Sequence, residues 1–389
     1  MNTTANIDAA LRRAAEAKEV PGVVAMAATE GGVIYEGAFG LRDLVAGPAM
    51  TLDTVFRIAS MTKAVTSVAA MQLVEQGKLH LDEPIGKVLP ELAAPQVLDG
   101  FDSSGRPQLR PARRPITLRH LLTHTAGFGY EVWNPQLGRY VEVTGNPAFL
   151  TGKLAALRAP LVFDPGERWE YGINIDWAGC AVEAASGQSL DTYFREHIFA
   201  PLGMTDTGFV ASADQAARLV RVHRRASDGS LEPLSFERPP GEFFSGGGGL
   251  ISTGYDYLVF LQMLLHQGRY NGAEVLRPET IALLEQNQLG ELQLGVMKTA
   301  MPELSNDVDL FPGVRCGHGL ANVINLQPGP DGRSTGTMTW AGLFNSYYWI
   351  DPQKRVAGVI LTQILPFADS RAVRLYREFE RGVYEALKN

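Results

Sequence analysis

The chain has 389 residues, of which 45% are hydrophobic and 20% are charged, and its formal net charge at pH 7 is −7. This composition is typical of a globular protein with a large core. The acidic balance, and the lack of a basic stripe interleaved with aromatic residues, argue against nucleic acid as a partner.

The sequence also gives three expectations that bear on cellular location. No run of about 18 apolar residues occurs, so we expect no membrane span. Charged side chains interrupt the first 20 residues, so we expect no signal peptide. The two cysteines, Cys180 and Cys316, are too few for a disulfide framework and are interpreted as buried thiols. We therefore expect a cytoplasmic protein.

The first part of the chain predicts a helix, a hairpin and a second helix. Residues 5–19 carry apolar side chains at helical spacing. Residues 22–40 indicate two strands around the turn sequence EGG. A long apolar helix from about residue 60 to residue 76 ends before Gly77. The middle of the chain is mostly helix and loop, with helices expected at 117–124, 176–186, 189–199, 255–266 and 278–287.

The end of the chain changes to short runs that are rich in strand-forming residues. These runs are GHGLANVINL, STGTMTWAG, FNSYYWID and VAGVILTQI. The turn sequences PGPDG and DPQK lie at two of the junctions between these runs, so an antiparallel meander is expected. An amphipathic helix is predicted at 370–387.

Together these patterns predict an α+β fold. The N-terminal hairpin and the C-terminal meander would form one antiparallel sheet of about five strands, flanked by the two terminal helices. This sheet domain would be discontinuous, with residues 1–80 and 290–389. Residues 81–289 would be a mainly helical insertion, with the active site at the interface of the two parts.

Two polar residues at the start of the long apolar helix suggest catalysis. Ser60 and Lys63 are three positions apart, and residues i and i+3 share one face of a helix. A serine hydroxyl is a weak nucleophile until a base takes its proton. Lysine can be that base when burial and the positive end of the helix dipole favour its neutral form. The alternative is a helix cap at Ser60 with Lys63 in water, but the apolar run that follows favours a buried lysine.

Such a site also needs a proton shuttle and donors for an oxyanion. Tyr171 follows a Pro–Gly turn at the start of a predicted helix, and a nearby lysine would stabilise its phenolate. Taken alone, it is better interpreted as an ordinary core or surface tyrosine. The sequence Trp340-Ala341-Gly342 interrupts a predicted strand and would let the backbone N–H of Leu343 face the serine. The alternative is a hairpin with Gly342 in its turn.

At this point the chain resembles the serine β-lactamase-like superfamily, which includes class C β-lactamases and D-alanyl-D-alanine peptidases. It is most similar to the family VIII carboxylesterases of that superfamily. The resemblance covers nearly the whole chain and rests on segments in the family's order: FRIASMTKAVTSVAAMQLVEQGKL, ITLRHLLTHTAGF, DPGERWEYG, GGGGLISTGYDYLVFLQMLL and GHGLANVI.

The resemblance implies the β-lactamase and penicillin-binding-protein fold and a role for each site residue. Ser60 would be the acylated nucleophile. Lys63 and Tyr171 would share the general-base and general-acid work. The backbone N–H groups of Ser60 and Leu343 would form the oxyanion hole.

Two departures from the family pattern bear on substrate. Penicillin-active relatives usually carry Tyr-x-Asn, whereas here the asparagine is three positions after Tyr171, at Asn174. They also carry Lys-Thr-Gly on the sheet strand, where this chain has tryptophan at position 340 and glycine at position 342. Replacing the lysine with Trp340 removes a cation and adds an apolar wall, which favours neutral esters over anionic β-lactams. Tyr130 and Trp133 are further candidates for pocket walls, although packing of a long loop explains them equally well.

Other motifs are weaker. The sequence GRSTG at 332–336 matches the G-x-S-x-G elbow of α/β-hydrolases, but a strand pattern follows it and no histidine comes after Ser334. His120 and His124 have a spacing that zinc sites use, but no glutamate of an H-E-x-x-H motif lies between them, so packing or a loop hydrogen bond is preferred. The glycine-rich stretch 244–253 is interpreted as a tight loop that borders the site.

The sequence therefore predicts a serine carboxylesterase that hydrolyses short-chain esters through an acyl-Ser60 intermediate, with weak β-lactam hydrolysis as a side activity. No metal or organic cofactor is expected, and the partner is a small ester. A β-lactamase, an amidase or D-aminopeptidase, and an acyltransferase remain as alternatives because they share the acylation step. A binding-only homologue is a further alternative, but the retention of Ser60, Lys63 and Tyr171 argues against it.

Overall fold

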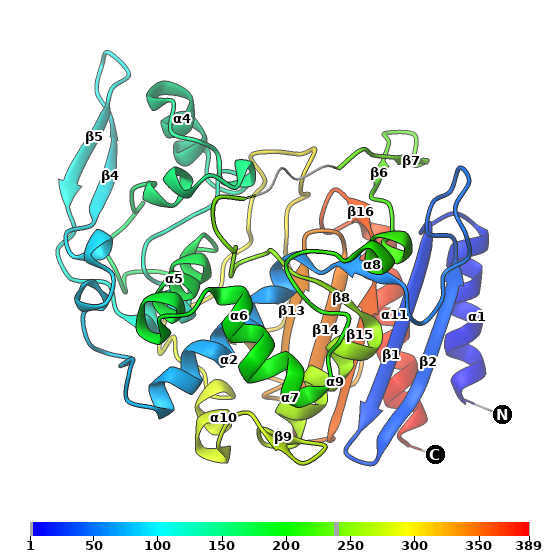
Figure 1. Ribbon diagram of the computed structural model, residues 1–389. Helices are drawn as coiled ribbons and strands as arrows, with labels where there is room; N and C mark the ends of the chain where they lie inside the picture. Colours follow the sequence, from blue (N-terminus) through cyan, green and yellow to red (C-terminus); the bar gives the residue numbers. More distant parts are fainter. Residues whose placement is uncertain (1–2, 237–240, 389) are drawn as a thin grey trace.

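A seven-stranded antiparallel sheet forms the centre of the protein (Figure 1). The computed structural model describes residues 3–236 and 241–388. The strand order is β11-β12-β13-β14-β15-β1-β2. The strands are β1 (Gly22–Thr29), β2 (Gly32–Gly40), β11 (Cys316–His318), β12 (Val323–Asn325), β13 (Met338–Gly342), β14 (Ser346–Asp351) and β15 (Val356–Leu361). The predicted joining of the N-terminal hairpin to the C-terminal meander is confirmed, because β1 pairs with β15.

The predicted number of about five strands is too small. The run GHGLANVINL, expected as one strand-like segment, forms the two short strands β11 and β12. A turn separates them, in which the N–H of Gly319 donates to the carbonyl of Asn322 at 2.8 Å. β12 pairs only with Met338 and Thr339 of β13, so the stretch Trp340 to Gly342 extends beyond it. This extension packs against the turn formed by Ala59–Met61.

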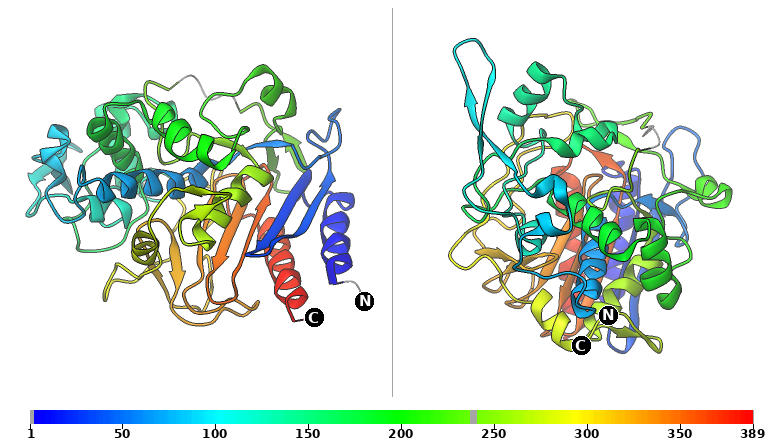
Figure 2. Two further views of the ribbon diagram at one scale, coloured as in Figure 1. Left: turned by 60° about the horizontal axis from the view of Figure 1, so that its bottom comes forward. Right: turned by 60° about the vertical axis from the view of Figure 1, so that its left-hand side comes forward.

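Helices cover both faces of the sheet. The terminal helices α1 (Thr3–Glu16) and α11 (Ser370–Ala386) lie side by side on one face (Figure 1 and Figure 2). Helix α9 (Gly254–Leu265) covers the other face. Successive side chains of a strand point to opposite faces of the sheet. In β14, Tyr347 therefore stacks on Tyr376 of α11, whereas Tyr348 packs on Tyr257 of α9.

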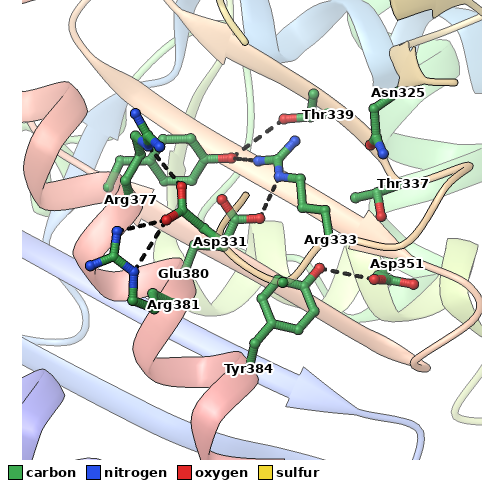
Figure 3. A network of polar contacts seen from close by, with 12 residues as sticks. Asn325, Asp331, Arg333, Thr337, Thr339, Asp351, Arg377, Glu380, Arg381 and Tyr384 are labelled. Carbon is green, nitrogen blue, oxygen red and sulfur yellow. Dashed lines mark hydrogen bonds and ion pairs between the residues drawn. The ribbon is translucent and has the colours of Figure 1, made fainter. Parts of the chain in front are cut away.

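The loop between β12 and β13 fastens α11 to the sheet (Figure 3). Arg333, which is 3% exposed, forms an ion pair with Glu380 of α11, which is 2% exposed. Asp331 accepts hydrogen bonds of 2.7 Å from both Arg377 and Arg381 on the same helix. A buried charge requires a partner of this kind, so the loop and the helix depend on each other.

This loop contains the GRSTG sequence, and its structure agrees with the rejection of a nucleophile elbow. The backbone N–H of Ser334 donates to Asp351 at 2.9 Å. The segment leads into strand β13, whereas an elbow requires a helix after the serine. Ser334 is therefore part of a structural turn.

The remaining helices and strands lie outside the central sheet (Figure 1). The helices include α2 (Thr62–Glu75), α3 (Leu118–Leu122), α4 (Pro135–Thr144), α5 (Asn174–Ser186), α6 (Leu190–Phe194), α7 (Ala200–Leu202), α8 (Ala213–Arg218) and α10 (Pro278–Leu284). The short strands are β3 (Val55–Arg57), β4 (Gln96–Phe101), β5 (Pro107–Pro111), β6 (His223–Arg225), β7 (Leu231–Pro233), β8 (Ile251–Thr253), β9 (Arg269–Tyr270), β10 (Ala273–Glu274) and β16 (Ile364–Leu365). The sequence did not predict the β4–β5 hairpin, which projects from the body of the protein (Figure 2).

The division into two domains at residues 80/81 and 289/290 stays a prediction. Helix α9, which that division assigns to the inserted part, packs against β1 and β15 of the sheet. Within the described ranges, no helix combines the length and the apolar character that crossing a bilayer requires.

Candidate active site

Ser60 lies at the entrance to the long buried helix. A single 3₁₀ turn, Ala59–Met61, connects β3 to α2. Ala59 has a φ of 44°, a left-handed conformation that is uncommon for a residue other than glycine. Every residue of α2 from Thr62 to Leu73 is buried. The apolar sequence of this helix therefore reflects complete burial, and Ser60 is held at its N-terminal end.

Lys63 is buried beside the serine, as the i, i+3 spacing predicts. The side chain is 2% exposed. Its Nζ donates to Ser60 Oγ at 3.1 Å, to the hydroxyl of Tyr130 at 3.2 Å and to the carbonyl of Gly247 at 2.6 Å. A lysine ammonium has three N–H donors and no acceptor. The three contacts thus equal the number of donors of the charged form.

Tyr171 contacts the same serine oxygen from a distant part of the chain. Its hydroxyl donates to Ser60 Oγ at 2.6 Å. Its ring centroid lies 4.7 Å from Nζ of Lys63. The structure thus brings together the three residues that the sequence singled out for catalysis.

Tyr130 has a more central place than the predicted pocket wall. It is 6% exposed, and its hydroxyl accepts a hydrogen bond from Lys63. The same hydroxyl lies 3.5 Å from Oδ2 of Asp176. Tyr130 therefore belongs to the polar network around the lysine.

Asp176 is a site residue that the sequence interpretation missed. It is 0% exposed and lies in the first turn of α5. Its Oδ1 accepts a hydrogen bond from Ser245 Oγ at 2.7 Å and another from the N–H of Gly247 at 3.0 Å. These bonds hold the glycine-rich loop so that the carbonyl of Gly247 reaches Lys63. The loop borders the site as predicted.

The end of β13 lies against the turn that carries the serine. A Cβ atom at Gly342 would lie 2.4 Å from the carbonyl oxygen of Ile58, so only glycine permits this approach. Leu343, directly after the strand, is half-buried. The approach agrees with the predicted oxyanion hole of the Ser60 and Leu343 N–H groups, whose function stays a prediction.

Aromatic rings surround Tyr171. The ring of Trp340, which is 5% exposed, has its centroid 4.9 Å from that of Tyr171. The ring of Trp133 lies 5.3 Å away, and its indole N–H donates to Ser305 Oγ at 3.1 Å. Tyr130 lies 5.2 Å away in an edge-on arrangement. The predicted wall residues Trp340, Trp133 and Tyr130 therefore meet at the tyrosine.

The chain is similar over nearly its whole length to several known proteins. A protein-family model described as Beta-lactamase matches residues 7–382. The chain is 35% identical over 396 residues to monacolin J acid methylbutanoyltransferase of Aspergillus terreus, covering 97% of this chain and 95% of that protein. It is 32% identical over 396 residues to lovastatin esterase of Penicillium rubens, covering 97% and 98%. A mutant of simvastatin synthase from Aspergillus terreus has a similar structure, with a TM-score of 0.89, 34% identity and coverage of 100% and 96%.

Proposed function

Because the chain belongs to the Beta-lactamase family of serine enzymes, we propose that it transfers acyl groups from carboxylic esters through an acyl-Ser60 intermediate. The acceptor in this proposal is an alcohol, with water as a competing acceptor. One observation carries the proposal: Ser60 Oγ is in hydrogen-bond contact with both Lys63 and Tyr171. A serine held by two proton-transfer groups is the arrangement that nucleophilic catalysis requires.

In the acylation step, Ser60 Oγ attacks the carbonyl carbon of the ester. In the reactive state Tyr171 is a phenolate, which the neighbouring Lys63 cation stabilises, and its oxygen takes the proton of Ser60. The backbone N–H groups of Ser60 and Leu343 receive the negative charge of the tetrahedral oxygen. Tyr171 then gives the proton to the departing alcohol, and the C–O bond to that alcohol breaks.

In the deacylation step, the same groups act on the acceptor. Tyr171 takes the proton of an incoming hydroxyl group, whose oxygen attacks the acyl carbon. The bond to Ser60 breaks, and Ser60 recovers its proton. An alcohol yields a new ester, and water yields a carboxylic acid. The relative access of alcohol and water therefore decides between transfer and hydrolysis.

The relatives favour transfer over the hydrolysis that the sequence placed first. Over almost the full length of the chain, the identity is 35% to a methylbutanoyltransferase and 32% to an esterase. Transfer and hydrolysis would share the acyl-Ser60 step in this chain, so the proposed mechanism is compatible with each. The somewhat higher identity to the transferase supports an alcohol as the preferred acceptor, with hydrolysis as the slower side reaction.

The substrate class follows from the walls around Tyr171. Trp340 occupies the strand position where penicillin-active relatives carry a lysine, and its ring packs on Tyr171. Aromatic walls favour apolar groups and offer no cation for a substrate carboxylate. We therefore propose neutral esters with short acyl groups as donors, including branched groups such as the methylbutanoyl group in the name of the relative.

The test is a competition between water and an alcohol. The enzyme is given p-nitrophenyl butyrate with increasing concentrations of benzyl alcohol, and p-nitrophenol, butyric acid and benzyl butyrate are measured together. The proposal predicts that benzyl butyrate forms at the expense of butyric acid. Butyric acid alone, at every alcohol concentration, would show that the enzyme is a hydrolase. The Ser60→Ala variant controls for uncatalysed transfer and should produce neither product above background.

A further inference from the structure

His124 contacts the residues on both sides of Tyr171. The backbone N–H of Glu170 donates to the carbonyl of His124 at 2.9 Å. The backbone N–H of Gly172 approaches Nδ1 of the same histidine at 3.4 Å. The ring centroids of His124 and Tyr171 are 4.9 Å apart. One histidine therefore contacts the tyrosine segment through its backbone and through its side chain.

The backbone around Tyr171 is conformationally restricted. His124 has a φ of 56°, in the left-handed region that few residues other than glycine and asparagine adopt. On the other side of the tyrosine, a Cβ atom at Gly172 would lie 2.4 Å from the carbonyl oxygen of Phe128. The segment around Tyr171 is thus held between His124 and the chain at Phe128.

The hydrogen bonds also define the protonation state of the histidine. Nδ1 of His124 faces two donors, the N–H of Gly172 and the side-chain amide of Asn174 at 3.0 Å. It must therefore accept, which places the single ring proton on Nε2. Burial, the neighbouring His318 and the Lys63 cation hold the pKa of His124 well below its usual value. The ring consequently stays neutral and keeps its acceptor.

We propose that His124 is a positioning residue that fixes the hydroxyl of Tyr171 on Ser60 Oγ for proton transfer. The inference rests on the proton-transfer role of Tyr171 in the proposed function. His124 itself exchanges no proton with the substrate. Its contribution is to keep the hydroxyl at hydrogen-bond distance, because proton transfer depends on that geometry.

A merely structural histidine and a positioning histidine predict different kinetics. Loss of a structural residue lowers the amount of folded enzyme, so the apparent kcat/KM falls by the same factor for every substrate. Displacement of Tyr171 impairs protonation of the leaving group. Ethyl butyrate releases ethanol, which needs that proton, whereas p-nitrophenyl butyrate releases a stable phenolate. Because both esters carry the same acyl group, the ratio of their kcat/KM values isolates the leaving-group step.

The variants are His124→Leu, which removes the acceptor, and His124→Asn, whose amide oxygen can replace Nδ1 and whose residue type tolerates a positive φ. The expected result for His124→Leu is a kcat/KM for ethyl butyrate that falls about tenfold more than that for p-nitrophenyl butyrate, a fraction of the full general-acid effect. His124→Asn should restore most of the ratio. An unchanged ratio in His124→Leu, with only a common loss on both esters, would overturn the proposal.

Two further variants separate the possible failures. His223 is also fully buried, and its Nε2 accepts a hydrogen bond from the N–H of Leu44 at 3.2 Å. His223→Asn therefore perturbs a buried histidine in another part of the fold and should leave the ratio unchanged. Tyr171→Phe should shift the ratio at least as far as His124→Leu. If Tyr171→Phe leaves the ratio unchanged, the proposed role of the tyrosine is wrong; if only the His124 variants do so, the positioning inference alone is wrong.

Discussion

The hydroxyl of Tyr171 lies 2.6 Å from Oγ of Ser60, although the two residues are 111 positions apart in the chain. Lys63, only three positions from the serine, reaches the same oxygen at 3.1 Å. A local contact and a long-range contact thus converge on one hydroxyl. The first turn of α2 supplies the local contact, and the packing of Tyr171 against Trp340 of β13 and against His124 supplies the long-range contact. The chemistry of the site depends on both.

Removal of the lysine charge should abolish most activity without a large change in volume. Lys63→Met keeps a side chain of similar length but removes the cation beside Ser60 and Tyr171. We expect kcat/KM for p-nitrophenyl butyrate to fall by about 10² to 10⁴, the usual contribution of acid–base catalysis. The exposed pair of Lys87 and Glu83, at 2.8 Å, offers a control. Lys87→Met should keep normal activity, and a Lys63→Met enzyme with normal activity would contradict the mechanism.

The tryptophan on β13 should control the preference between neutral and anionic substrates. Trp340→Lys introduces a cation at the position where penicillin-active relatives carry one. The kcat/KM ratio of nitrocefin to p-nitrophenyl butyrate should rise roughly tenfold, which corresponds to about 1.4 kcal/mol of added attraction. Trp340→Leu removes the ring without adding charge and should not raise that ratio. An equal rise in both variants would mean that space, and not charge, excludes the β-lactam.

The buried ion pair between Arg333 and Glu380 should be needed for stability. Arg333→Met leaves the Glu380 carboxylate buried without its partner, which typically costs about 3–5 kcal/mol. Arg377→Met is the matched control, because Arg377 is 45% exposed and Arg381 still contacts Asp331. That variant should lose no more than about 1 kcal/mol. Urea unfolding measures both, and equal losses would show that the Arg333 pair has no special role.

Stability should fall in mild acid because of the buried histidines. Burial lowers the pKa of His318 to about 4, from 6.5. The folded state therefore binds fewer protons than the unfolded state between these values, so the free energy of unfolding falls as the pH drops from 6.5 to 4. The maximum effect is about 3 kcal/mol. His124 contributes in the same direction.

This prediction is measured by unfolding at pH 7 and pH 4. His318→Asn keeps a donor for the carbonyl of Gly319, which His318 Nδ1 contacts at 2.6 Å, but it cannot titrate. Its stability should therefore depend less on pH than that of the wild type. His80→Asn, at an exposed position, should follow the wild type. Identical pH dependence in all three proteins would exclude a contribution from His318.

Local patterns were enough to predict most of the architecture. The turn sequence EGG between two runs predicted the β1–β2 hairpin, the runs of strand-forming residues predicted the C-terminal strands, and the apolar run predicted α2. The same local geometry placed Lys63 beside Ser60. The errors lie where periodicity is weak. β11 and β12 have only three residues each, too few for a pattern, and the β4–β5 hairpin alternates poorly because polar residues occupy both of its faces.

The missed site residues depend on contacts that no local pattern encodes. Gly247 reaches Lys63 across 184 residues, and Asp176 holds that glycine from another helix. Asp176 resembles any acidic residue in a first helical turn. The role of His124 could be inferred only from its contacts with Glu170 and Gly172, the two residues that flank Tyr171. A signal existed for Tyr130, an aromatic residue just after the HTAGFG sequence, but it did not distinguish a pocket wall from a lysine partner.

Identification of the acyl-enzyme tests the central claim most directly. The enzyme is mixed with p-nitrophenyl butyrate, quenched in acid within the first turnovers, and examined by intact mass and peptide mapping. We predict one butyryl group, located on the peptide that contains Ser60, and none in Ser60→Ala. A butyryl group on another residue such as Ser334, or full turnover by Ser60→Ala, would contradict the account.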